Sequence, residues 1–328
     1  MTGTATPTRD RLEQALRLYR RRIDRCRTEN QRNRVHIMVE NYMTPAEVRQ
    51  FAAALAGDPA DSPSRQWIVR LAGRLPVNKA RPAEFARKGL CKGATRYTNG
   101  DASTPQKTLI VGVSGHFHRL MVPTPWLLDC LNPALYDVVI LRDFSRIYYS
   151  SGIPGLGRDF AAAIAGLGRR IDPRAYRNTI AVGTSGGGLA ALLAAALLDF
   201  DKAIAIGAQD FAHVAGKLKA FAATDDPYTA FLASPRERRW PELLLAYGAD
   251  NRGDAASAAA IHAILPSELR PVKRCGEHAV LAWQHERGTL PAYLAKLLGQ
   301  GLESREMIAL AGMALNAPST INLSPIAR

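Results

Sequence analysis

The sequence is poor in cysteine. Four cysteines occur in 328 residues, at Cys26, Cys91, Cys130 and Cys275, and they are widely scattered. They show neither the density of a disulfide scaffold nor a C-x-x-C spacing, which argues against a disulfide-stabilised architecture and favours a reducing compartment. We therefore interpret them as small core residues. An H-E-x-x-H motif is also missing, so the sequence predicts no metal site and no cofactor.

Long apolar runs are missing as well. None reaches the roughly 20 residues that a membrane-spanning helix needs, and the first ten residues lack the charged-then-apolar pattern of a signal peptide. The sequence therefore predicts a cytoplasmic protein. Internal repeats and low-complexity segments are absent, whereas hydrophobic residues make up 47% of the chain, which is enough to bury a sizeable core.

Basic residues are concentrated in the first third of the chain. Residues 1–107 hold 21 Lys and Arg against 10 Asp and Glu, residues 108–328 hold 22 against 19, and the net charge of the whole is +14. Such a basic surface suits an anionic membrane, a nucleic acid or an anionic substrate, and it is equally typical of a solvated face. Because no nucleic-acid-binding motif accompanies the charge, we favour the solvated face and expect no specific nucleic-acid partner.

Residues 1–105 predict a basic, mainly helical N-terminal extension. From residue 9 onward, apolar side chains recur at three- and four-residue spacing and so share one helix face. They are Leu12, Leu16, Tyr19, Ile23 and Cys26. Arginines fill much of the other face, so this helix could lie on an anionic surface or pack on its own domain, and packing is the commoner case. The Thr-Pro-Ala-Glu run at 44–47 predicts the capped start of a second helix to about residue 56, and 66–75 is a third.

Strands and helices alternate regularly over residues 106–328, which we interpret as the catalytic domain. The expected strands are short apolar runs at 108–113, 136–141, 179–182, 203–206, 243–247 and 269–273. Helices are expected near 124–132, 157–170, 187–199, 255–264, 290–298 and 303–314. This alternation predicts an α/β fold with a mostly parallel, doubly wound sheet. The mixed segment 211–241 would lie over the site as a short lid.

The segment 179–198 joins a buried strand to a helix through a glycine-rich turn. Its centre reads Gly-Thr-Ser-Gly-Gly at 183–187, and an Ala/Leu-rich run that favours a helix follows. A serine in so sharp a turn is strained, and the residues two before and two after it approach so closely that both must be small. This layout is typical of a nucleophile elbow, in which Ser185 is the catalytic nucleophile. The alternative is a plain turn that cradles phosphate; a dinucleotide fingerprint fits less well, because Ser185 stands where its second glycine would be.

A candidate acid and a candidate base follow in chain order. The base should follow the last strand, and of seven histidines only His278 stands in the loop after the last predicted strand, at 269–273, which makes it the candidate general base. Two aspartates follow the strand that ends at Tyr247. Asp250 lies close to the strand end, and Asp254 stands just before an alanine-rich run, where it would be a natural helix N-cap. We prefer Asp250 as the acid and keep Asp254 as the alternative.

The first strand of the alternating region leads into a glycine-containing loop at 112–118. Backbone amides in this loop could face the space above Ser185. We therefore expect the amide of Ser114 or Gly115 to form an oxyanion hole together with the amide of Gly186.

Two loops hold candidate substrate contacts. His116 and His118 belong to the first of them, and Tyr148 and Tyr149 belong to the long loop 143–157 after the second strand. Loops at the carboxyl ends of parallel strands shape the ligand site of such sheets. Tyrosines beside hydroxyl groups suit a sugar-linked ligand.

The order of Ser185, an aspartate and His278 resembles the Ser…Asp…His order of the α/β-hydrolase superfamily over residues 105–300. The resemblance implies an eight-stranded, mostly parallel sheet, of which six strands are visible in the sequence. It also implies that the family's nucleophile, acid and base roles fall on these positions. The loop at 113–116 departs from the family's His-Gly-Gly pattern, since it reads Val-Ser-Gly-His, and leaves the oxyanion donors open.

Three functions fit these observations. The favoured one is a serine hydrolase, an esterase or deacylase, that cleaves a small-molecule or sugar-linked ester through an acyl-enzyme. The second is an acyltransferase with the same triad, in which an acceptor hydroxyl replaces water. The third is a non-catalytic α/β-hydrolase-like protein whose basic extension binds an anionic surface.

Overall fold

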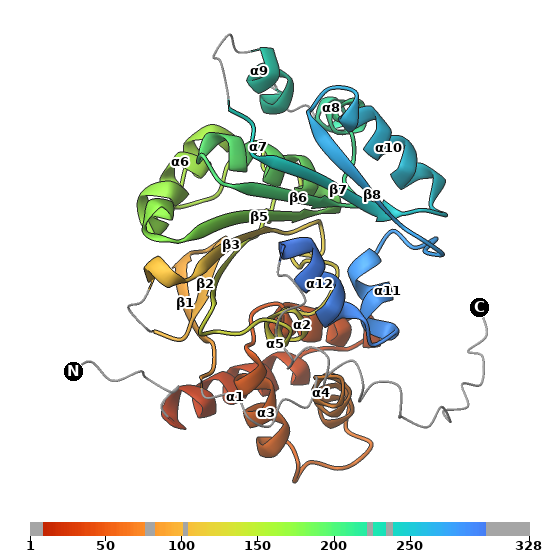
Figure 1. Cartoon of the computed structure of the whole chain (residues 1–328). Coiled ribbons are helices and arrows are strands. Elements are labelled where there is room, and N and C mark those ends of the chain that lie inside the picture. The colour runs from red at the N-terminus through yellow and green to blue at the C-terminus, as the bar shows by residue number, and fades with distance from the viewer. Residues whose placement is uncertain (1–8, 76–82, 101–103, 222–225, 234–238, 300–328) are drawn as a thin grey trace.

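The computed structural model describes residues 9–75, 83–100, 104–221, 226–233 and 239–299. The predicted helix near 303–314 lies outside these ranges. Within them, one eight-stranded sheet is covered by helices on both faces (Figure 1). The fold class predicted from the sequence, a mostly parallel α/β sheet with a helical N-terminal extension, is confirmed.

The strands lie in the order β1-β2-β4-β3-β5-β6-β7-β8. Their bounds are Ala86–Cys91, Ala94–Thr98, Thr108–Val113, Tyr136–Leu141, Asn178–Thr184, Lys202–Ile206, Glu242–Gly248 and Ser267–Val272, for β1 to β8. β2 is antiparallel to both β1 and β4, and every other neighbouring pair is parallel. β3 lies between β4 and β5, so the strand order reverses at β3. In α/β sheets, ligands bind at the carboxyl ends of the strands where the order reverses in this way.

The hairpin of β1 and β2 corrects the predicted domain boundary at residue 105. Both strands fall within the predicted extension, yet β2 pairs with β4 from Ala94–Leu141 to Tyr97–Val138 and so continues the sheet. The sequence did not reveal the hairpin because β1 is an edge strand with four of its six residues exposed, and it lacks apolar alternation. The extension outside the sheet is therefore the helical part at 9–75.

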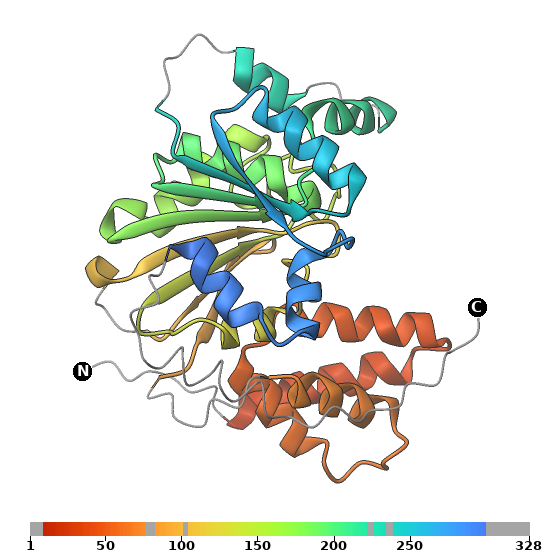
Figure 2. The ribbon, with the colours of Figure 1, turned by 45° about the vertical axis from the view of Figure 1, so that its right-hand side comes forward.

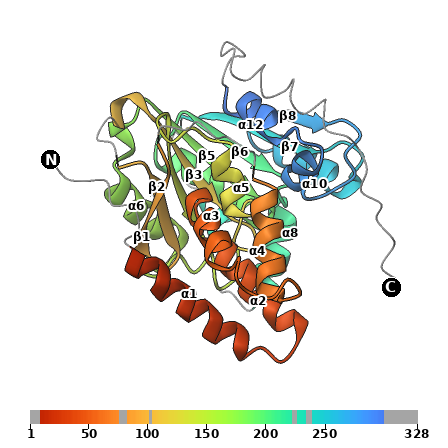
Figure 3. The same cartoon turned by 90° about the horizontal axis from the view of Figure 1, so that it is seen from below.

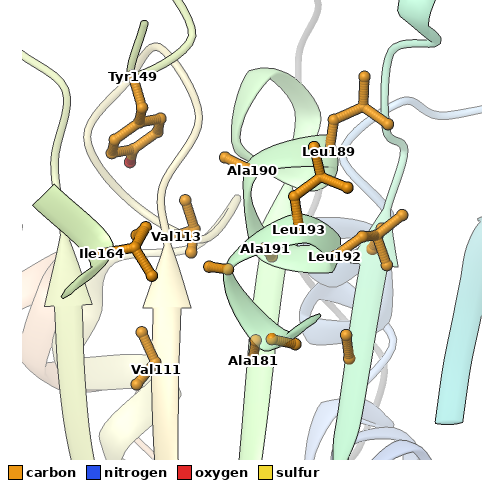
Figure 4. Packing of buried hydrophobic residues seen from close by; sticks show 14 of the residues in the cluster. Val111, Val113, Tyr149, Ile164, Ala181, Leu189, Ala190, Ala191, Leu192 and Leu193 are labelled. Carbon is orange, nitrogen blue, oxygen red and sulfur yellow. The ribbon is translucent and has the colours of Figure 1, made fainter. Parts of the chain in front are cut away.

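Helices cover the two faces of the sheet and create two cores (Figure 2). On one face lie α5 (Thr124–Asp129), α11 (Val280–Glu286) and α12 (Leu290–Leu298); on the other lie α6 (Phe160–Ile171), α7 (Gly188–Leu197) and α10 (Arg252–His262). Alternate strand residues face opposite cores: Ile110 belongs to the core that α5 and α11 share, whereas Val111 belongs to the core on the side of α7, which also holds Ala191 and Leu193 (Figure 4). Burial on both faces explains why these strands read as continuous apolar runs.

Two helices lie between β6 and β7, in the segment predicted as a lid. They are α8 (Phe211–Ala220) and α9 (Pro227–Ala233), and the rest of the segment includes 222–225 and 234–238, which lie outside the described residues. Phe211, Val214 and Leu218 bury one face of α8 in the adjoining core. A lid function of this segment stays a prediction.

Four helices at the N-terminus pack together below the sheet (Figures 1 and 3). They are α1 (Arg9–Asp24), α2 (Glu29–Glu40), α3 (Pro45–Ala54) and α4 (Pro63–Gly73). The predicted capping box of α3 is present, since Thr44 and Glu47 each accept from the other's backbone amide. α2, which the sequence did not predict, begins with a second box of Thr28 and Gln31. No helix in the described ranges is both long and apolar enough to cross a bilayer.

The first helix packs on the protein itself. The ring of Tyr19 is 3% exposed and stacks on Trp67 at 5.4 Å between centroids, and its hydroxyl lies 3.1 Å from Nε2 of His36. This apolar contact uses the face that the three- and four-residue spacing predicts. Binding of the remaining, arginine-rich face to an anionic surface stays a prediction.

A buried arginine joins the N-terminal helices to the sheet. Arg142, directly after β4, is 1% exposed. Its guanidinium donates to the carbonyl of Asn41, just after α2, and to Oγ1 of Thr95 in β2 at 3.1 Å, while its Nε donates to the carbonyl of His118 at 3.2 Å. The ring centroid of Tyr42 lies 4.1 Å away. The helices, the sheet and the loop after β3 are therefore fixed to one another at this residue.

Tyr19→Ala is expected to lower the free energy of unfolding by about 3 kcal/mol, because a large aromatic side chain is removed from a packed site. The adjacent Leu18, on the same helix, is 53% exposed. Leu18→Ala is therefore a matched control and should cost no more than about 0.5 kcal/mol. Urea denaturation followed by tryptophan fluorescence measures both. Equal stabilities of the two variants would show that α1 does not contribute to the packed structure.

Candidate active site

Ser185 occupies the turn between β5 and α7. Its φ is +51°, a left-handed conformation that costs a non-glycine residue about 1–3 kcal/mol. A Cβ on Gly183 would lie 2.3 Å from the carbonyl oxygen of Gly187, and a Cβ on Gly187 would lie 2.3 Å from the carbonyl oxygen of Val113. Both flanking positions therefore require glycine. The sharp strand-to-helix turn predicted from the sequence is present.

His278 lies beside Ser185. It stands in the loop between β8 and α11, with Nε2 3.0 Å from Oγ of Ser185 and Nδ1 2.9 Å and 3.1 Å from the two carboxylate oxygens of Asp254. An ionised carboxylate can only accept, so Nδ1 carries a proton and Nε2 is left to accept from the serine hydroxyl. Residues from three separate segments of the chain thus form one hydrogen-bonded chain.

The acidic member of this chain is Asp254, so the preference for Asp250 is wrong. Asn251 caps α10 and accepts from the amide of Asp254, which places Asp254 in the first turn of the helix and not at the cap. Side chains lean toward the N-terminus of their helix, and this direction carries the carboxylate to His278. Asp250 contacts the histidine loop through its backbone, since its N–H donates to the carbonyl of Cys275 at 3.0 Å, and the residue is exposed.

Asp254 raises the pKa of His278 above its usual value, chiefly through the hydrogen bond and also through its charge, while partial burial acts in the opposite direction. A more basic imidazole takes a proton from the neighbouring hydroxyl more readily. The His278 side chain is 45% exposed and that of Asp254 only 12%. The imidazole is therefore open to water, whereas the carboxylate that orients it is shielded.

Gly207 lies against His278, with Met121 on the glycine as well, and neither residue was predicted from the sequence. Gly207 directly follows β6 with φ +55°. A Cβ there would lie 3.2 Å from Cε1 of His278 and 3.1 Å from Cε of Met121. The sequence does contain a signal for Gly207, because a glycine directly after a strand often marks a place where another part of the chain approaches closely.

The predicted oxyanion donors are only partly available. The amide of Ser114 donates to the carbonyl of Leu141 at 3.1 Å, so Ser114 is not a free backbone donor and that prediction is wrong. Gly115 lies directly against the nucleophile turn: a Cβ on it would be 3.2 Å from Cβ of Ser185, and its amide donates to no acceptor in the described part of the chain. Gly186 opens the helical segment after Ser185, where the first amides of a helix have no partner within it.

Of the two predicted tyrosine contacts, Tyr149 is a structural residue. It is 2% exposed, and its hydroxyl lies 2.8 Å from the carbonyl of Ser114 and 3.0 Å from that of Leu141, which binds the ends of β3 and β4 together. Its predicted contact with substrate is therefore wrong. Tyr148 is also buried, but its ring packs edge-on against His116 at 5.0 Å.

His118 belongs to the same loop as His116, and its Nδ1 is buried without a hydrogen-bond partner among the described residues, so its contact with substrate stays a prediction. Its ring packs against that of Phe144 at 4.9 Å, and its carbonyl accepts from Arg142. Substrate contacts of His116 and Tyr148 stay predictions. Among the described residues, no group of three or more His, Cys, Asp or Glu side chains is arranged to hold a metal ion.

The chain has the α/β-hydrolase fold. This fold is defined by the antiparallel β2, the reversal of strand order at β3 and the turn of Ser185 after β5. It is also defined by the segments after β7 and β8, which bring Asp254 and His278 together. No protein-family model and no curated protein matches the sequence.

Several solved structures are similar to this chain at low identity. Esterase B from Lactobacillus rhamnosis (HN001) is 13% identical, with 82% of this chain and 97% of that one covered and a TM-score of 0.44. An α/β-hydrolase enzyme from the metagenome of sediments from the lagoon of Mar Chica, Morocco, is 18% identical, with 67% and 99% covered and a TM-score of 0.40. The capsule O-acetyltransferase of Neisseria meningitidis serogroup A is 12% identical, with 67% and 99% covered and a TM-score of 0.42. At such values these likenesses carry no argument about the reaction.

Proposed function

We propose that this protein is a serine hydrolase, an esterase or deacylase that acts on a small-molecule ester through an acyl-enzyme. The observation that supports it most is the hydrogen-bonded chain from Ser185 Oγ through His278 to Asp254, with contacts of 3.0 Å and 2.9 Å. The strained turn holds the serine hydroxyl at the carboxyl edge of the sheet, where a substrate can approach.

In the proposed reaction, His278 Nε2 takes the hydroxyl proton as Oγ of Ser185 attacks the ester carbonyl carbon. The carbonyl electron pair moves to oxygen, and the resulting oxyanion is stabilised by backbone amides such as those of Gly186 and Gly115. His278 then gives the proton to the departing alkoxide, which leaves as an alcohol. Asp254 keeps the imidazole in the correct tautomer and stabilises the imidazolium.

A water molecule completes the cycle by the reverse steps. His278 takes a proton from water, the hydroxide attacks the acyl carbon, and the carboxylic acid leaves as Ser185 regains its proton. The exposure of the His278 side chain gives water access to the base at this stage. This access is why we favour hydrolysis over transfer to an alcohol acceptor.

Labelling with a fluorophosphonate probe tests the proposal directly. The wild-type protein should be labelled at one site, and Ser185→Ala should abolish the labelling, because only an activated serine attacks the probe at a useful rate. Ser114→Ala is the matched control, since Ser114 is a nearby serine in the same region, and labelling should persist. Turnover of p-nitrophenyl acetate then measures hydrolysis. A folded wild-type protein that remains unlabelled would refute the assignment and favour a non-catalytic binding protein.

A further inference from the structure

The side chain of His116 lies against the residue that follows the nucleophile. A Cβ built on Gly186 would be 2.9 Å from Nε2 and 3.1 Å from Cδ2 of His116, and 3.3 Å from Cε1 of Tyr148. The imidazole therefore occupies the space that a side chain at position 186 would fill. This explains why a glycine follows Ser185, and it places a ring nitrogen beside an amide expected to contact the oxyanion.

Nε2 of His116 is buried and has no hydrogen-bond partner among the described residues. A buried polar atom without a partner is unfavourable, and native structures rarely keep one without a reason. The atom lies against Gly186, the residue that directly follows the reacting serine. A ligand atom at this position would supply the missing partner.

The ring of His116 is held in place by its surroundings. Tyr148 packs against it with an interplanar angle of 67°, an edge-to-face contact, and is itself 2% exposed. Tyr148 has φ +57°, so its backbone adopts a strained conformation that presents the ring to His116. The nitrogen is therefore positioned before substrate binds, as an electrostatic contribution to catalysis requires.

The surroundings also keep the imidazole neutral. Burial lowers the pKa of His116, and the positive charges of Arg146 and Lys217 act in the same direction, while Asp143 opposes them. A neutral imidazole protonated at Nε2 donates a hydrogen bond without transferring its proton. The lysine and arginine also favour negative charge at this point.

We propose that Nε2–H of His116 donates a hydrogen bond to the oxyanion that forms when Ser185 attacks the ester carbonyl. The inference rests on the proposed function and adds a side-chain donor to the backbone donors. No bond to His116 forms or breaks: the carbonyl electron pair moves to oxygen as the Oγ–C bond forms, and it returns when the alkoxide leaves. His116 strengthens its hydrogen bond as the charge develops and keeps its proton throughout.

Two substitutions of His116 distinguish its role as a hydrogen-bond donor from its packing against Tyr148. His116→Gln keeps an N–H donor, whereas His116→Phe keeps a ring against Tyr148 without a donor. With p-nitrophenyl acetate, the Phe variant should lose about 10²–10³-fold in kcat with KM within about threefold, and the Gln variant should recover at least about tenfold of that loss. The control is Phe117→Ala, since Phe117 is adjacent and 68% exposed, and its kcat should change by less than about twofold.

A transition-state analogue supplies the second readout. A trifluoromethyl ketone forms an oxyanion with the serine, so its inhibition constant should rise in the Phe variant by about the factor lost in kcat. Thermal unfolding checks that each variant is folded, and His116→Ala is a second donor-free variant if the Phe side chain disrupts the loop.

Two results would overturn the role of His116. Equal kcat values in the Gln and donor-free variants would do so, as would a rise in KM at constant kcat. Absence of any fluorophosphonate labelling in the wild type is a different failure, because it would refute the proposed hydrolase activity itself.

Discussion

His278→Ala is expected to lower kcat for p-nitrophenyl acetate hydrolysis by about 10⁶-fold, as removal of a triad histidine does in serine hydrolases. Without Nε2, which lies 3.0 Å from Oγ of Ser185, nothing takes the hydroxyl proton. Residual rate would come from substrate binding and oxyanion contacts alone. Steady-state kinetics on protein quantified for folded molecules measures the effect.

His262→Ala is the matched control for His278→Ala. His262 is exposed at the end of α10, the helix that carries Asp254, and its Nδ1 lies 3.3 Å from Oγ of Ser267. Activity should stay within about twofold of the wild type. A His278→Ala variant that keeps more than a hundredth of the wild-type kcat would contradict the role of His278 as the general base.

Asp254→Asn is expected to lower kcat by about 10⁴-fold, whereas Asp250→Asn should change it by less than about threefold. The asparagine amide can donate to Nδ1 of His278, which would place the imidazole proton on Nε2, facing Ser185, where the wrong tautomer cannot accept the hydroxyl proton. The comparison of the two variants tests whether Asp254, and not Asp250, is the acid that orients His278. A larger loss in Asp250→Asn would show that the alternative acid is the functional one.

The pH profile of kcat/KM also tests the coupling between Asp254 and His278. His278 acts as a base only when neutral, so wild-type kcat/KM should fall as the pH drops through its pKa, which Asp254 raises above the usual value of about 6.5. Removal of the negative charge in Asp254→Asn removes the cause of that rise. The acidic limb of the residual activity should therefore move to lower pH, and an unchanged or higher midpoint would contradict the coupling of the two residues.

The parallel strands were predictable because burial on both faces leaves an unmistakable pattern. β3 and β4 begin and end where the apolar runs at 108–113 and 136–141 do. The edge strand β1 is mostly exposed and reads as a polar connection, so the hairpin at 86–98 was missed. A strand at the edge of a sheet needs only one apolar face, and β1 has few buried residues on either face.

The candidate site was predictable where the local sequence dictates the backbone. The spacing of Gly183, Ser185 and Gly187 specifies the turn, and position after a strand singled out His278. The choice between the two aspartates depends on where α10 begins, and Asn251 competes successfully for the cap. The use of Ser114 and Tyr149 in holding strand ends together depends on tertiary hydrogen bonds, which no local pattern contains.

Arg142 connects the N-terminal helices to the loop after β3, which carries His116 beside the candidate active site. One guanidinium, sealed from solvent, hydrogen-bonds the chain just after α2 and also the carbonyl of His118, two residues beyond His116. Residues 9–75 are thus an integral part of the fold. A chimaera that exchanged them for unrelated helices would leave a buried cation facing mismatched acceptors, and turnover would suffer along with solubility.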